Sequence, residues 1–464
     1  MRSKDAFDEM VSVADRIVQR EEGIWRERMI GDLYRNVDEI AEAVVRRERM
    51  MGCCWQQRAD DVILSRQYGY PLMMLLLAGV LWLTIVGANI PAAWLAEGLF
   101  TLLDGLSALL TWSGVPLWVH DIVVHGMAQC LVWVIAVMLM PMVIFFMLFT
   151  LLEDIGYLPR IALCLDWIFY RSCACGKQAL TMCMGLGCNA AGVVACRIID
   201  SPRERILAMV TNSFVPCNGR FPTILLLASL LVGAMTLGSG SSLLVACMVT
   251  GGVLLGVAVT FAVTGILAKT LLRGEPSTMI LELPPYRMPD VRAVLYRSLW
   301  ERTRFVLRRA VVVAMPAGVI IWMLAHVSVG EVSLLIWLAQ LLEPVAWYLG
   351  LDGAILLAFL LGMPANEIVL PILLMIYLQN GQMTEAGSIA EIGEILTCHG
   401  WTVLTMVNTA MFTLFHWPCA TTLLSVYQES HCMKWAILAA ILPTGAGCII
   451  CLVIAGIMRG VGIV

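Results

Sequence analysis

The sequence predicts an all-α, polytopic transmembrane protein with broken helices. Of its 464 residues, 60% are hydrophobic and only 14% are charged, and the mean hydropathy is +0.85. A soluble domain of this size could not cover so much apolar surface, whereas a lipid bilayer accepts it. Uninterrupted apolar runs long enough to cross roughly 30 Å of hydrocarbon recur along the chain.

The distribution of charge predicts the topology. Lys and Arg concentrate in residues 1–66, 197–205 and 269–309, and we expect these stretches to face the cytoplasm, together with the N-terminus. The first residues, "MRSKDAFDEM", lack an apolar core and are not expected to be a cleaved signal peptide. Most of the 16 cysteines lie inside apolar runs, which is typical of reduced, buried thiols. No feature indicates nucleic-acid binding.

Four regions follow from these patterns. We expect a cytoplasmic amphipathic helical linker at 1–66, a first transmembrane half at 67–268, a basic cytoplasmic connector at 269–309 and a second transmembrane half at 310–464. One face of the linker carries the apolar side chains of Phe7, Met10, Val11, Ala14, Ile17 and Val18.

The hydropathy divides each half into spans. In the first half the predicted elements are a span at 71–88, a partial crossing at 93–118, a span at 122–151 kinked at Pro141, and spans at 206–233 and 242–268. In the second half they are spans near 310–328, 333–350, 353–378, 400–428 and 434–458. The polar insert 379–398 is expected to be a loop or a short surface helix.

Two similar pairs of breaks suggest a binding site. "GLGCN" (185–189) and "VPCNGRFP" (215–222) in the first half correspond to "GMPANE" (362–367) and "WPCATT" (417–422) in the second. Matching interruptions in two halves are the best sequence indication of a transporter's binding site. Backbone groups freed by a break are tolerated only where protein or a hydrated cavity covers them. We expect the glycines to let the chain unwind and a ligand approach the backbone.

The side chains at the breaks favour a transition metal. Sulfur comes from Cys188, Cys217 and Cys419, and oxygen from Asn189, Asn366 and Glu367. Such mixed donors suit Fe(II), Mn(II) or Zn(II) better than Na⁺ or K⁺. A carboxylate within a span costs on the order of 3 kcal/mol, so Glu367 is the strongest functional candidate. Each Pro-Cys break could instead be only a packing kink.

Histidines add two weaker candidates. His416 lies beside the second Pro-Cys break and is either a further ligand or a buried, hydrogen-bonded core residue. His120 and His125, with Asp121 between them, are expected near the outer face, where they could form part of a funnel.

Four ordered stretches resemble the membrane domain of the ferrous iron transport protein B family. They are "LLEDIGYLPRIA" (151–162), "GLGCNAAGVVACRIIDSPRERIL" (185–207), "LELPPYRMPDVRAVLYRSLWERTRFVLRRA" (281–310) and "PCATTLLSVYQESHCMKWAI" (418–437). The resemblance implies two gate-type repeats and a permease that imports Fe(II) across a prokaryotic plasma (inner) membrane. Cys188, Asn189 and Cys419 match the family motifs directly. Cys217 and Glu367 fall where the family also has a cysteine and a glutamate.

Departures from the family pattern shape the remaining expectations. Asn366 stands where the family usually has a lysine. Members typically begin with a GTP-binding domain, but the sequence contains no G-x-x-x-x-G-K-[ST] phosphate loop. We therefore expect a transporter and not an enzyme, with no resident cofactor and with Fe(II) as the transported substrate. A separate GTPase subunit, operation without one, and a homo-oligomer in the membrane lipid all remain open.

Two alternatives compete with this interpretation. A transporter of the same architecture could carry another divalent metal or a nucleoside. A non-transporting membrane sensor or scaffold could instead bind iron or a GTPase and signal through the N-terminal segment.

Overall fold

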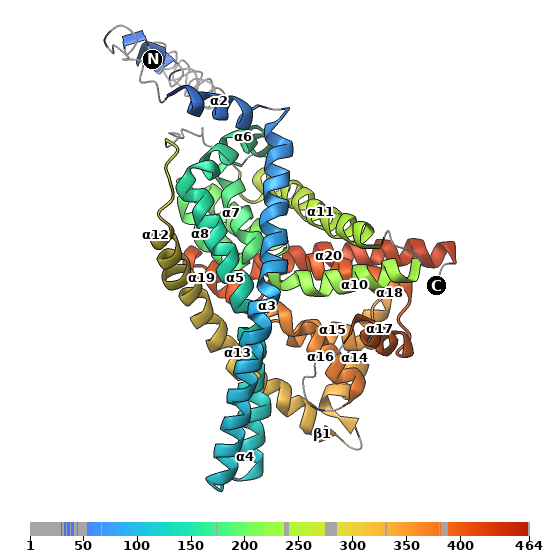
Figure 1. The fold of residues 1–464 in the computed structure, drawn as a ribbon. Helices are drawn as coiled ribbons and strands as arrows, with labels where there is room; N and C mark the ends of the chain where they lie inside the picture. Colours follow the sequence, from blue (N-terminus) through green and yellow to red (C-terminus); the bar gives the residue numbers. More distant parts are fainter. Residues whose placement is uncertain are drawn as a thin grey trace, which may run out of the picture.

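The computed structural model describes residues 53–65, 67–172, 174–235, 241–273, 285–329, 332–379, 381 and 388–462, with a few isolated positions before 53. Nearly all of the described chain is helical; the one small sheet in it pairs β1 (Ser328–Val329) with β2 (Val332–Ser333). In the described part of the chain, six helices are long and apolar enough to cross a membrane, or seven if one bent pair counts as a span. The predicted all-α polytopic fold is confirmed (Figure 1). The apolar face predicted within residues 7–18 lies outside the described residues.

A long hairpin opens the membrane part. It consists of α3 (Gly69–Trp112), α4 (Leu117–Asp121), the π-helix η1 (Ile122–Ala128) and α5 (Gln129–Ile155). Two predictions are wrong here: the end of the first span at Ala88 and the separate partial crossing at 93–118. The helix α3 is 44 residues long and continues through Pro91 to Trp112. Packing against α5, for example between the Phe100 and Trp133 rings, holds the two helices together beyond that point.

The first repeat follows the hairpin. Its elements are α6 (Tyr157–Arg171), α7 (Lys177–Gly187), α8 (Asn189–Ala195), η2 (Cys196–Ile198), α9 (Pro202–Thr211), η3 (Asn212–Phe214), η4 (Asn218–Arg220) and α10 (Phe221–Met235). After it come α11 (Ser241–Thr270), α12 (Val291–Tyr296), the π-helix η5 (Arg297–Thr303) and α13 (Arg304–His326).

The second repeat is also built from short helices. They are α14 (Leu334–Tyr348), α15 (Gly353–Leu361), η6 (Asn366–Ile368), α16 (Val369–Leu378), α17 (Ile389–Cys398), α18 (Val403–Phe415) and α19 (Ala420–Ser430), followed by the long α20 (Met433–Val461). The spans predicted at 353–378 and 400–428 are both interrupted at the motifs, as the predicted breaks at 362–367 and 417–422 require. α14 and α15 are bent by 110°.

The repeats correspond residue by residue in their first part. The Asp166 carboxylate accepts a hydrogen bond from Gly176 N at 2.7 Å, and the Glu343 carboxylate accepts one from Gly353 N at 2.6 Å. The steps from 166 to 343 and from 176 to 353 are both 177 residues. In both repeats an acidic side chain therefore fixes the start of the helix that leads into the first break.

A polar contact joins α2 (Cys53–Ile63) to the first repeat. The Asp60 carboxylate accepts hydrogen bonds from Arg160 Nε at 2.5 Å and from the Tyr286 hydroxyl at 2.7 Å. Burial raises the pKa of the Asp60 carboxyl, but these hydrogen bonds outweigh it and hold the pKa below its usual value. The segment before the membrane, α6 and the connector at 285–290 thus meet at one point.

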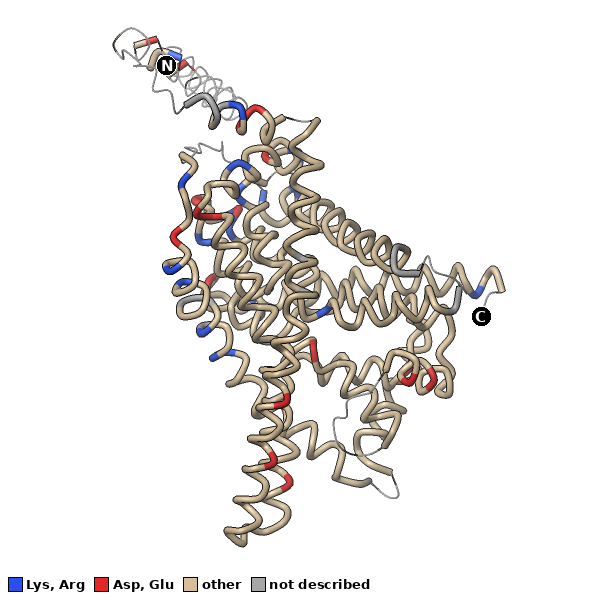
Figure 2. The backbone as a smooth tube through the Cα atoms, in the orientation of Figure 1, with Lys and Arg blue, Asp and Glu red and all other residues tan. Residues whose placement is uncertain are grey.

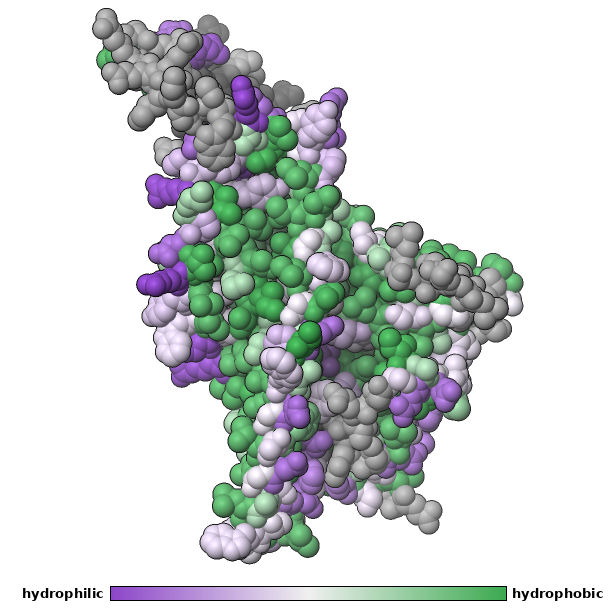
Figure 3. Space-filling model, viewed as in Figure 1, coloured by the Kyte–Doolittle hydropathy of each residue, from purple (hydrophilic) through white to green (hydrophobic). Residues whose placement is uncertain are grey.

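Charge is distributed unevenly over the molecule. Figure 2 shows Lys and Arg gathered along the upper end and the flank formed by α12 and α13. The charged residues of the lower hairpin are all acidic, in agreement with a sequence that has no Lys or Arg between 67 and 159. Figure 3 shows apolar surface over the middle of the body, with hydrophilic residues along the lower hairpin.

We expect Gly353→Ala to destabilise the protein by about 1–3 kcal/mol, because a Cβ there would lie 2.0 Å from the Ala339 carbonyl oxygen. Gly456→Ala in α20 is the matched control, since nothing lies within 4 Å of its added Cβ and alanine is the better helix former. Thermal unfolding in detergent should show a lower midpoint for the first variant only. Equal midpoints would contradict the proposed close packing.

Candidate metal site between the helix breaks

The first break is centred on a cysteine. Cys188 is extended (φ −154°, ψ 120°) between α7 and α8. The sequence suggested that the glycines around Cys188 make room for a ligand, but the structure shows a different role. Instead, a Cβ at Gly185 or Gly192 would come within 2.6 Å of the Asn212 amide. That amide donates to the Asn189 carbonyl at 3.1 Å and so joins η3 to the start of α8 beside the break.

The second break has the same backbone shape. Ala365 is extended (φ −152°, ψ 125°) and stands 177 positions after Cys188. The residue that follows, Asn366, connects three segments: its Oδ1 lies 3.2 Å from His416 Nε2, and its Nδ2 lies 3.9 Å from Cys217 Sγ. His416 Nδ1 also faces the Phe412 and Thr413 carbonyls. Both ring nitrogens of His416 are thus engaged, which favours the interpretation of a buried, hydrogen-bonded core histidine.

The two Pro-Cys motifs end in matching positions. Cys217 precedes η4 and Cys419 precedes α19, and both have extended backbones with ψ of 165° and 154°. The Cys419 thiol lies 3.1 Å from the Thr422 hydroxyl. The amide of Ala420 donates to the Met363 carbonyl at 2.7 Å, which ties the two breaks of the second repeat together.

All six sequence-predicted residues line one cavity of about 30 Å³, room for roughly one water or a bare ion. They are Cys188, Asn189, Cys217, Asn366, Glu367 and Cys419. Within the described chain, their thiols and the carboxylate form no group of three whose ligand atoms lie within 4.8 Å of one another. Among the described residues, the cavity therefore holds no closed cage of thiol and carboxylate ligands.

Glu367 joins this cavity to a larger one. A second cavity of about 270 Å³ lies against α3 and α5, has several alanines of α3 in its lining, and shares Asn218, Gly219 and Glu367 with the first. No ion pair among the described residues includes Glu367. A Cβ at Gly219 would lie 2.3 Å from Glu367 Oε1, so glycine at that position leaves space for the carboxylate.

Comparisons with known proteins agree with this architecture. A family model described as "Nucleoside recognition", called Gate, matches residues 135–231 and 307–431, and another, "Ferrous iron transport protein B C terminus", matches residues 249–302. Three relatives are each named as Fe(2+) transporter FeoB, one of them as a fusion with Fe(2+) transport protein A. The chain belongs to the ferrous iron transport protein B family.

The relatives cover most of this chain. The protein of Staphylococcus aureus strain MSSA476 is 25% identical over 84% of the chain and 57% of its own length. The fusion protein of Porphyromonas gingivalis is 25% identical over 83% and 49%, and the protein of Methanocaldococcus jannaschii 26% identical over 95% and 64%. The chain thus spans about half to two thirds of these relatives. No solved structure matches it.

The two Gate segments contain both pairs of breaks, and they also contain a residue that the motifs did not single out. Arg220 is fully buried, and its guanidinium donates to the carbonyls of Leu414 at 2.6 Å, His416 at 3.0 Å and Trp417 at 3.4 Å. These carbonyls border the second Pro-Cys break, so Arg220 from the first repeat caps the second. The sequence feature that could have identified Arg220 is a charged residue inside an apolar span.

Replacing Arg220 with methionine should destabilise the protein by at least about 2 kcal/mol, because several buried carbonyls would lose their donor. Arg459→Met is the control, since that arginine also donates to a carbonyl, that of Trp347, but at an exposed position. The yield of monodisperse protein and its unfolding midpoint would be measured in detergent. A midpoint for the Arg220 variant as high as that of the control would show that the bridge between repeats is dispensable.

Proposed function

We propose that this chain is the permease core of a ferrous iron importer, in which Fe(II) passes between the two gate repeats. The observation that carries this proposal is the single cavity lined by Cys188, Asn189 and Cys217 from one half and by Asn366, Glu367 and Cys419 from the other. The names of the relatives, all Fe(2+) transporters, support the choice of metal.

The donor chemistry suits transport better than tight binding. Thiol and amide groups bind borderline-soft Fe(II) in preference to Na⁺ or K⁺. Because the three thiols and the Glu367 carboxylate include no three ligand atoms that lie within 4.8 Å of one another, an ion would exchange partners as it advances. Passage requires binding that is favourable enough to enter a site and weak enough to leave it.

The two connected cavities give the passage a direction. The larger one, beside α3 and α5, would act as a vestibule for a hydrated ion. Glu367 stands where it meets the smaller, sulfur-lined cavity, so its carboxylate would replace lost water ligands. The ion would then reach the thiols.

The distribution of basic residues supports one orientation in the membrane. Their concentration at one end of the molecule supports a cytoplasmic location for that end in a prokaryotic plasma membrane. The contact of Asp60 with Arg160 and Tyr286 lies there too. A GTP-binding protein or domain acting on α2 would therefore reach the first repeat directly through α6.

The description "Nucleoside recognition" of the Gate family model makes a nucleoside the second candidate substrate. The cavity at the breaks is about 30 Å³, whereas pockets for drug-sized ligands are roughly 300–1,000 Å³. Three thiols along the passage also have no evident role in nucleoside binding. A membrane-impermeant Fe(II) chelator in the external medium should abolish uptake of the cargo if it is iron and leave uptake unchanged if it is a nucleoside.

Cys188→Ala should reduce the uptake of radiolabelled iron at least tenfold in cells that lack other importers, because the first sulfur contact would be lost. Cys183→Ala is the matched control: this cysteine lies in α7, five residues earlier, and is not among the residues that line the cavity. Normal uptake by the Cys188 variant at equal membrane abundance would argue strongly against the proposal.

Glu367→Gln keeps the shape of the side chain and removes its charge. We expect at least a tenfold loss of uptake without a change in folding, because no protein cation depends on this carboxylate. Glu394→Gln, at an exposed position of α17, is the control. The assay is initial-rate iron uptake in proteoliposomes, and equal rates for the two variants would remove Glu367 from the passage.

A further inference from the structure

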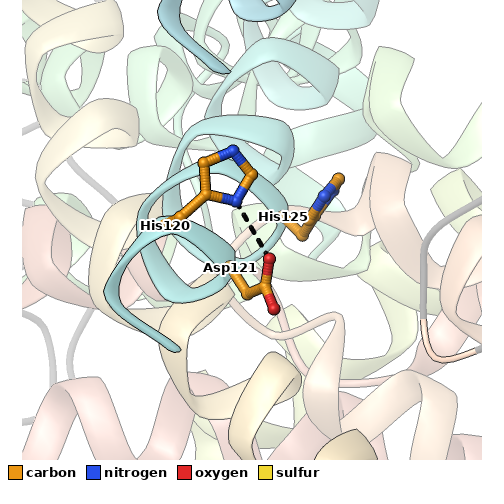
Figure 4. Close-up of side chains that lie close together, drawn as sticks. All are labelled: His120, Asp121 and His125. Atoms are coloured by element: carbon orange, nitrogen blue, oxygen red, sulfur yellow. Dashed lines mark hydrogen bonds and ion pairs between the residues drawn. The ribbon is translucent and has the colours of Figure 1, made fainter. Parts of the chain in front are cut away.

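A second group of metal-ligand side chains lies at the tip of the α3–α5 hairpin. It consists of His120 at the end of α4, Asp121 beside it and His125 in η1 (Figure 4). One ligand atom from each lies within 4.8 Å of the others. We propose that these three residues bind a first-row divalent metal ion and form the outer capture site of the protein.

The π-helix is what brings the two histidines together. In an α-helix, residues five apart point about 140° away from each other. The wider i→i+5 turn of η1, which begins directly after α4, reduces this angle, and the His120 and His125 rings lie edge-to-face with their centroids 5.9 Å apart. Insertions of this kind weaken a helix and occur frequently at functional sites. The departure from regular α-helix therefore brings His120 and His125 close enough to share a ligand.

Neighbouring residues hold the ligands in place. The Ser107 hydroxyl on α3 lies 2.9 Å from His120 Nε2, and Asp121 Oδ1 lies 3.0 Å from His120 Nδ1. With a metal ion at Nδ1, the Nε2–H would donate to Ser107, the outer contact that orients most metal-bound histidines. Gly318 of α13 packs tightly against Gly126 of η1: a Cβ added at Gly318 would lie 2.3 Å from the Gly126 carbonyl oxygen.

The ligand set suits capture of a passing ion. Two imidazoles and one carboxylate fill only part of a coordination shell and leave positions for water, as in non-haem Fe(II) sites. Asp121 and His125 are partly exposed while His120 is buried, so the site is open on one side.

The electrostatics of the hairpin point the same way. Residues 67–159 contain no Lys or Arg, and the outer part of the hairpin also carries Glu97 and Asp104. At ~1.5 Å per residue, α3 is about 66 Å long, roughly twice the hydrocarbon thickness. The tip can therefore stand beyond the bilayer, on the side away from the basic end, while alanines of the same helix line the vestibule. The role in capture rests on the proposed function, whereas metal binding at the tip does not.

Co(II) titration of the purified full chain in detergent tests the binding. The wild type should show absorption bands of nitrogen and oxygen ligation, and His125→Ala should lose them and bind at this site at least tenfold more weakly. Asp121→Asn should weaken binding similarly while leaving the buried His120 in place. His326→Ala is the matched control, since that histidine lies in α13, contacts a helix carbonyl and belongs to no such cluster. Identical spectra and affinities for wild type and both hairpin variants would overturn the site.

Uptake kinetics test the capture role. His125→Ala should raise the KM for Fe(II) uptake roughly tenfold with little change in the maximal rate, because the passage itself is intact. An unchanged KM would overturn the capture role. If wild type transports no iron but still shows the Co(II) bands, the proposed function fails and the tip site stands.

Discussion

Every backbone group inside a bilayer needs a hydrogen-bond partner within the protein, and this constraint shapes the centre of the molecule. Each repeat interrupts its helices twice, at Cys188 and Cys217 in the first and at Ala365 and Cys419 in the second. The exposed carbonyls are satisfied by side chains from other segments, above all by the fully buried Arg220. The breaks are stable because side chains from other segments of the two repeats supply the hydrogen bonds that the interrupted helices lack.

This mutual completion also places the functional groups. Asn366 bridges the second break to Cys217 of the first repeat, and Gly219 leaves the space that the Glu367 carboxylate occupies. Sulfur and oxygen donors from two distant parts of the sequence therefore line one cavity. The buried positive charge of Arg220 is directed at carbonyls and not at an ion, so the cavity keeps donors suited to a cation.

The sequence predicted the class of fold and the six cavity residues because both depend on local features. Apolar runs identify spans, and Gly, Pro, Cys and Asn clusters mark the points where they break. It failed where long-range packing decides the outcome. The predicted partial crossing at 93–118 ended the first span at Ala88, but contact with α5 carries α3 on to Trp112. The glycines near Cys188 accommodate Asn212, a contact that no spacing reveals. The π-turn that pairs His120 with His125 is likewise invisible in the residue pattern.

X-ray absorption at the iron edge of the Fe(II)-loaded full chain, with His125→Ala to remove the tip site, addresses the central claim most directly. If broken helices from two halves bring thiols and oxygens around the ion, the spectrum must contain a sulfur shell alongside lighter atoms, and that shell must vanish when Cys188, Cys217 and Cys419 are all replaced by serine. A first shell of oxygen and nitrogen alone, unchanged by those replacements, would contradict the account.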